Sequence, residues 1–210
     1  MKKVTILAVV LLMTAILVVQ PVQADEIADL GTLYYWYSDS NEIGSWFNSS
    51  IPMYCYNLSG NSSFPFSTMV NHAANQWSSA LSVSITTTTD ISSSMISVYG
   101  GTAEQFTQLG HPGSFNNVAG FTNVDYSFLG YWYYPTTNTY KSGCVMTSGV
   151  SHILDKNATL DNYKTVTTHE IGHALGWLGH SSSSSDIMYP YVSTTTTLTT
   201  RDITHLSQTY

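Results

Sequence analysis

Stretches of strand-like and helix-like hydrophobic patterning follow one another along most of the chain. Apolar and polar side chains alternate over residues 51–56, the two-residue period of a half-buried β-strand. Apolar positions recur at steps of three and four over residues 67–81, which predicts an amphipathic helix. Strands interleaved with helices predict an α+β, or α/β-like, fold. Further strands are expected at residues 83–85, 96–98, 119–124 and 145–154, and further helices at residues 161–175 and from residue 199 onward.

In two parts of the chain, hydrophobic and polar residues follow no clear period. Residues 25–50 show little alternation, and we interpret them as an N-terminal arm or a short pro-segment. Residues 100–140 are rich in Gly, Asn and Tyr, and the strand at 119–124 is the only regular element expected there. The folded domain is therefore predicted to span residues 51–210.

The first 24 residues have the pattern of a secretory signal peptide. A basic start precedes an unbroken apolar run over residues 4–19, and the small side chains of Val22 and Ala24 favour cleavage before Asp25. The alternative is an uncleaved membrane anchor, for which a run of this length is somewhat short. No later segment is apolar enough to cross a bilayer. We therefore expect residues 1–24 to be removed and the rest of the chain to be secreted, with no stable membrane insertion.

The composition restricts the class of partner. Hydrophobic residues make up 43% of the 210 positions, which is enough for a core and argues against a disordered chain. The chain has 6 Lys and Arg against 13 Asp and Glu, which argues against nucleic acid binding because phosphates require a basic surface. Its two cysteines, Cys55 and Cys144, are too few for a disulfide scaffold, and the sequence leaves their pairing open.

A potential metal site lies within the helix predicted at residues 161–175. His169 and His173 are four residues apart, so their side chains project from one face of the helix and can share one ion. Glu170 points from the helix in a neighbouring direction, from which its side chain can reach a water molecule beside that ion. A Zn²⁺ ion with three protein ligands keeps its fourth position for water and lowers the pKa of that water to about 7.

The sequence after this helix supplies a candidate for the third ligand. Gly176 is placed to end the helix as a left-handed C′ residue, and His180 follows soon enough to fold back toward the helix. The stretch Asp-Ile-Met-Tyr-Pro at residues 186–190 predicts a tight turn beneath the metal. Two histidines four residues apart are only moderately specific by themselves, and this downstream context favours a zinc site.

These motifs resemble those of the metzincin clan of zinc metalloproteases. The stretch HEIGHALG at residues 169–176, followed by His180 and Met188, is similar to the zinc site and Met-turn of the matrixin branch of secreted metalloendopeptidases. Residues 198–210 are similar to the C-terminal helix of matrixins. The usual motif places its third histidine three residues after the Gly. That position here is Gly179, so a ligand at His180 implies a one-residue insertion.

The resemblance implies a fold and a role for each motif residue. The fold would be metzincin-like (zincin-like), with a twisted, mixed five-stranded sheet and about three helices. His169, His173 and His180 would bind the catalytic Zn²⁺, and Glu170 would act as the general base. The side chain of Met188 would pack beneath the imidazoles without bonding the metal. Tyr189, Pro190 and Tyr191 would form walls of the substrate pocket, although ordinary packing of the turn is an equally compatible interpretation.

Other polar residues are weaker candidates. Matrixins often carry Ca²⁺ or a second, structural Zn²⁺, and the residues considered for such a site here are His111, His152, Asp125, Asp155 and Asp161. Their spacing matches no defined pattern, so ordinary roles in loops and strands are favoured. His72 is interpreted as a helix-surface or capping residue, and His205 as exposed or packed against the preceding helix.

The sequence thus predicts a secreted zinc-dependent metalloendopeptidase. It would act as a monomer on protein or peptide substrates, using a metal-activated water and Glu170 as the base. The abundance of Tyr, Trp, Ser and Thr suggests as the alternative a non-catalytic surface adhesin or glycan-binding module, in which Glu170 would have no purpose. A metalloenzyme acting on a non-peptide amide would share the same chemistry, and the motif leaves it open.

Overall fold

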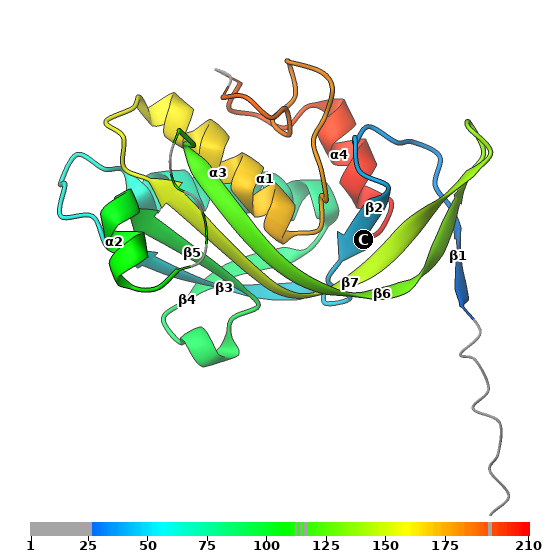
Figure 1. Cartoon of the computed structure of the whole chain (residues 1–210), viewed down its shortest axis with the longest axis horizontal. Coiled ribbons are helices and arrows are strands. Elements are labelled where there is room, and N and C mark those ends of the chain that lie inside the picture. Colours follow the sequence, from blue (N-terminus) through cyan, green and yellow to red (C-terminus); the bar gives the residue numbers. More distant parts are fainter. Residues whose placement is uncertain (1–26, 112, 114, 116, 193–194) are drawn as a thin grey trace, which may run out of the picture.

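A mixed sheet of seven strands organises the structure (Figure 1). The computed structural model describes residues 27–111, 113, 115, 117–192 and 195–210, and the expected signal peptide, residues 1–24, lies outside them. The strands are β1 (Ala28–Thr32), β2 (Glu42–Ser45), β3 (Ser50–Asn57), β4 (Ser84–Thr88), β5 (Ile96–Gly101), β6 (Gly120–Tyr134) and β7 (Thr139–Leu154). The α-helices are α1 (Phe66–Leu81), α2 (Ala103–Gln108), α3 (Leu160–Ala174) and α4 (Thr200–Ser207), and a 3₁₀ turn spans Ile91–Ser93.

The strand order confirms the predicted mixed α+β architecture. The sheet runs β1-β6-β7-β5-β3-β4, and β2 pairs with β7 beside this path. β6 and β7 form a long antiparallel hairpin, whereas every other pair of neighbouring strands is parallel. Among the described residues, no helix is long and apolar enough to cross a membrane.

The two strands beyond the five expected come from residues 25–50, for which the sequence indicated an N-terminal arm or a short pro-segment. β1 pairs with β6, and β2 pairs with β7, so residues 28–45 contribute to the same sheet as the rest of the chain. The two strands are only 5 and 4 residues long, and each contains a glycine. Segments this short do not repeat a hydrophobic period often enough to be recognised as strands.

Residues 100–140 are also more regular than expected. They contain α2 and the whole of β6, of which the sequence predicted only the first part. Most side chains of β6 are exposed or half-buried, and only Gly130 is buried. Because neither face of β6 is buried along its length, its sequence lacks the alternation that would indicate a strand.

α1 and α3 lie side by side on one face of the sheet and enclose the main core (Figure 1). Met69, Ala73 and Trp77 of α1 follow the predicted spacing and are completely buried. The indole Nε1 of Trp77 donates a hydrogen bond to the Thr168 carbonyl of α3 at 2.8 Å. α1 therefore acts as the support on which the metal-motif helix rests.

The end of α3 lies very close to β2. Gly176 has a φ of +112°, the left-handed conformation that the sequence predicted for the residue ending this helix. The amide of Gly44 donates to the Gly176 carbonyl at 2.9 Å. A Cβ atom built on Gly176 would collide with the backbone of Gly44, so glycine is required there for both conformation and space.

A smaller core lies on the opposite face of the sheet. Successive residues of a strand point to opposite faces, and Ile153 of β7 belongs to the main core whereas Leu154 packs with Phe106 in the smaller one. His152, which is completely buried, lies here as well, with its Nε2 2.9 Å from Nδ1 of His111. Its Nδ1 faces the Phe121 carbonyl at 3.4 Å, so Nδ1 carries the proton and Nε2 accepts from His111.

Cys55 and Cys144 are both free, which answers the question that the sequence left open. Cys55 lies on β3 and Cys144 on β7, and β5 runs between these two strands. A disulfide requires Cα atoms about 4.4–6.8 Å apart, a separation typical of neighbouring strands rather than of strands with a third between them.

We expect Gly176→Ala to destabilise the fold. The substitution would place a side chain at positive φ and force Gly44 away, at a cost of about 1–3 kcal/mol in the free energy of unfolding. Urea unfolding measures this cost. Gly60→Ala is the matched control, because a Cβ atom at Gly60 would have nothing within 4 Å. Equal unfolding midpoints for the two variants would contradict the close approach of the Gly176 and Gly44 backbones.

We expect His152 to make the stability depend on pH. Burial, aided by the neighbouring His111, lowers the pKa of His152 to about 4, whereas its pKa in an unfolded chain is about 6.5. Between these values the unfolded state binds more protons. The free energy of unfolding should therefore fall as the pH drops from about 6.5 to about 4, by an amount on the order of 3 kcal/mol. His152→Phe should show a shallower fall in unfolding experiments run in the same buffers, and parallel curves would refute this role.

Candidate active site

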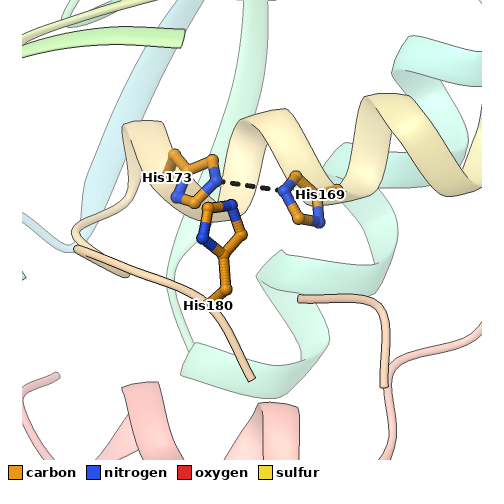
Figure 2. A group of neighbouring side chains, drawn as sticks. All are labelled: His169, His173 and His180. Atoms are coloured by element: carbon orange, nitrogen blue, oxygen red, sulfur yellow. Dashed lines mark hydrogen bonds between the residues drawn. The ribbon is translucent and has the colours of Figure 1, made fainter. Parts of the chain in front are cut away.

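Three histidines from two segments converge at one point (Figure 2). His169 and His173 project from the last turns of α3, and His180 reaches them from the loop that follows. One ring nitrogen from each residue lies within 4.8 Å of the other two. In the described part of the chain, no other group of three or more His, Cys, Asp or Glu side chains meets this condition.

Hydrogen bonds fix the protonation of the two helical rings. Nδ1 of His169 lies 2.7 Å from the Ile187 carbonyl, and Nδ1 of His173 lies 2.7 Å from the Trp177 carbonyl. Since a carbonyl oxygen can only accept, both rings carry their proton on Nδ1 and expose a lone pair on Nε2. Burial lowers the pKa of His169 to about 4 and that of His173 to about 3, so both imidazoles are neutral at neutral pH.

This arrangement fits a divalent transition metal. The Nε2 atoms of His169 and His173 are 3.0 Å apart, the contact drawn as a dashed line in Figure 2. Two unprotonated nitrogens at that distance repel each other unless a cation lies between them. Tetrahedral zinc with Zn–N bonds of about 2.0–2.1 Å places its ligand nitrogens about 3.3 Å apart. A zinc-binding histidine is usually neutral, with one ring nitrogen on the metal and the N–H of the other donating a hydrogen bond, as Nδ1 does here.

The loop between α3 and His180 accommodates the additional residue. Gly176 and Gly179 both have positive φ, +112° and +115°, so the chain turns sharply twice within four residues. Directly after His180, the amide of Ser181 donates to the Met188 carbonyl at 2.7 Å. The longer loop is therefore fixed at its end, and His180 faces the helical pair.

Glu170 is buried beside the three histidines and lines the same cavity. Burial raises the pKa of its carboxyl to about 7, although a hydrogen bond from Thr122 partly opposes this shift. The Thr122 hydroxyl lies 2.6 Å from Glu170 Oε2. A Cβ atom at Gly120 would lie 2.7 Å from Glu170 Oε1, so glycine leaves the space that the carboxylate occupies.

The turn that contains Met188 packs against α3. Met188 is completely buried, and its sulfur lies where a side chain on Gly172 of α3 would collide with it. The carboxylate of Asp202 accepts from the amides of Ile187 at 3.0 Å and Met188 at 3.2 Å. The carbonyl of the same Ile187 accepts a hydrogen bond from Nδ1 of His169. Asp202 of α4 therefore supports the ring of this histidine through the turn.

A cleft of about 790 Å³ surrounds the site. Tyr189, Pro190 and Tyr191 line it, and the rings of the two tyrosines lie 5.6 Å apart between centroids. Glu42 and Tyr126 also line the cleft, and the Tyr126 hydroxyl donates to Glu42 at 2.8 Å. The sequence predicted the first three residues as pocket walls but gave no indication of Glu42 and Tyr126.

The weaker candidates do not join this site. His111 and His152 bond to each other in the smaller core, and no described Asp, Glu or Cys completes a metal-binding group with them. Asp155 accepts instead from Ser59 at 2.6 Å. His205 is completely buried rather than exposed, and its ring packs on Trp177 at 4.1 Å between centroids.

Sequence reasoning missed several residues that shape the site. Thr122 and Gly120 lie in the first part of β6, which the sequence predicted as a strand at residues 119–124, but a strand prediction does not indicate that these residues border Glu170. Asp202 falls in the helix that the sequence predicts from residue 199 onward, where a carboxylate in the first turn indicates at most a helix cap. It does cap α4, accepting from the Thr199 amide at 2.9 Å, but it also holds the Met-turn. A capping motif cannot indicate which distant amides the same carboxylate will bind.

A comparison with known families agrees with this geometry. The family model described as Matrixin matches residues 57–210, well over half of the chain. A comparison with curated proteins finds no match. The matched region contains α1 to α4, the three histidines and the Met-turn. The chain therefore belongs to the matrixin family of zinc metallopeptidases.

Proposed function

We propose that this chain is a secreted zinc-dependent endopeptidase that cleaves peptide bonds within extended protein or peptide segments. The observation that carries the proposal is the meeting of three imidazoles and one buried carboxylate in a single cleft. Membership of the matrixin family supports the chemistry. Secretion rests on the signal-peptide pattern of residues 1–24.

His169, His173 and His180 would hold the zinc ion. When bound, zinc supplies Lewis acidity that polarises the scissile carbonyl and lowers the pKa of a water molecule. The chain's contribution is to present three lone pairs with little freedom to move. The carbonyls of Ile187 and Trp177 hold two of the rings in the correct tautomer.

Glu170 would act as the general base. Its carboxylate takes a proton from the attacking water and later delivers it to the departing amine. Burial favours the protonated form of this carboxyl, and a zinc ion beside it would favour the ionised form, so the two effects on its pKa oppose each other. The Thr122 hydroxyl, 2.6 Å from Oε2, would keep the carboxylate in one orientation during this exchange.

The substrate would bind beside the first half of β6. β7 pairs with one edge of β6, and β1 covers the other edge only at residues 130–133. Within the described residues, no strand covers that edge between 120 and 127, and this segment borders the cleft. An extended peptide could add to the edge through its backbone, with Tyr189, Pro190 and Tyr191 forming the facing wall.

We expect the purified protein to bind one zinc ion per chain. His180→Ala should weaken zinc binding by at least about tenfold, because one of three ligands is lost. Metal analysis and competition with a chromophoric chelator measure both quantities. His72→Ala is the control, since His72 bonds the Thr196 carbonyl away from the site. A zinc-free protein that retains affinity for glycans would instead support the adhesin alternative.

Glu170→Gln should separate metal binding from catalysis. The amide has nearly the same shape as the carboxylate but cannot accept the proton, so hydrolysis of a protein substrate should fall by about 10²–10⁴-fold while zinc is retained. Casein cleavage and metal analysis test the two effects on the same sample. Glu104→Gln, at an exposed position of α2, should cleave at the rate of the unchanged protein. Robust peptidase activity in the Glu170 variant would refute the assignment.

A further inference from the structure

His180 is held differently from the two helical histidines. The rings of His169 and His173 each have a backbone carbonyl at Nδ1. The ring of His180 makes no hydrogen bond to the residues that the structure describes, and the bonds of this residue all involve its backbone. The orientation of its imidazole therefore depends on how its backbone is fixed.

One residue binds both backbone polar groups of His180. The His180 amide donates to Asp39 Oδ1 at 2.6 Å, and the Asp39 amide donates to the His180 carbonyl at 3.0 Å. Beside them, the Ser38 hydroxyl donates to the Leu178 carbonyl at 3.2 Å. Residues 38–40, which we name the strap, therefore hold the loop 178–180 at two of its three residues.

The strap is itself firmly anchored. It lies between β1 and β2, and the amide of Tyr37 donates to the buried Nδ1 of His205 at 3.1 Å. The indole of Trp36 donates to the Ser40 carbonyl at 3.1 Å, and its ring packs on His205 at 4.8 Å between centroids. Through the strap, the position of the loop that carries His180 therefore depends on the sheet and on α4.

The strap and the additional loop residue fit each other. A Cβ atom on Gly179 would lie 2.5 Å from Asp39 Oδ1 and 2.6 Å from the Ser38 hydroxyl oxygen. The φ of Gly179, +115°, also excludes most other residues. A loop one residue longer than the usual spacing would place its histidine less precisely. Here the longer loop packs closely against the strap at Gly179, and Asp39 fixes the backbone of His180.

We propose that Asp39 is a positioning residue for His180, acting through the backbone of that histidine to set the third ligand of the metal site. The inference rests on the proposed zinc site. Asp39 is not assigned as a ligand, because its Oδ1 accepts from the His180 amide and it is not part of the cluster formed by the three histidines.

The test compares Asp39→Ala with Asp39→Asn in the full protein. Removing the acceptor should raise the dissociation constant for zinc by about 10–100-fold, the usual effect of losing a residue that orients a ligand. The amide oxygen of Asn can accept the same bond, so Asp39→Asn should bind zinc nearly as well as the unchanged protein. Chelator competition gives the affinity, and the visible spectrum of the Co²⁺-loaded protein reports the geometry of the site.

Asp90→Ala is the matched control. Asp90 also accepts a backbone amide, that of Ser92 at 2.9 Å, but it does so in the connection between β4 and β5, and its loss should leave zinc binding unchanged. Should Asp39→Ala fail to fold, Ser38→Ala removes the neighbouring bond to Leu178 and should still weaken zinc binding.

The outcomes separate this inference from the proposed function. Unaltered zinc affinity and cobalt spectrum in Asp39→Ala, or in Ser38→Ala if that variant is needed, would overturn the positioning role while leaving the zinc site intact. Equal losses in Asp39→Ala and Asp39→Asn would also overturn it, because the charge rather than the hydrogen bond would then matter. A wild-type protein that binds no zinc would overturn the proposed function and this inference with it.

Discussion

The contact between Gly44 and Gly176 fixes the end of the active-site helix against the sheet. The amide of Gly44 bonds to the Gly176 carbonyl at 2.9 Å, and neither backbone could approach so closely if Gly176 carried a side chain. Directly after this contact, Trp177 provides the carbonyl that orients the ring of His173. The same glycine starts the loop that leads to His180. The placement of two of the three histidines therefore depends on one close approach of backbones.

The site combines burial with few charges. The imidazoles of His169 and His173 are kept neutral by burial, and Glu170 is the buried carboxylate beside them. An incoming divalent cation would find lone pairs with no protons to displace, and its charge would stabilise the ionised form of Glu170. Burial makes these groups costly even though they are hydrogen-bonded, because the Nε2 lone pairs of the two rings have no proton donor among these bonds. The cost is consistent with a site built for a metal rather than for stability.

The parts of the site encoded by local spacing could be predicted from the sequence. Histidines four residues apart in a helix must share a face, and a glycine after the helix with a further histidine beyond it suggests a return toward that face. Residues brought in from distant strands could not be predicted. Thr122 lies in a strand segment that the sequence predicted, but its contact with Glu170 of α3 joins residues 48 positions apart, and Asp39 lies in a stretch without periodicity. Their roles depend on which strands pair, and a single sequence gives no direct sign of that pairing.

The incorporation of β1 and β2 into the sheet has a practical consequence for how the protein is produced. A recombinant version beginning at residue 51, where the patterned region starts, would lack both strands and leave open edges along β6 and β7. Unprotected strand edges promote association between molecules, so such a truncated protein would tend to aggregate. Expression should therefore start upstream of Ala28.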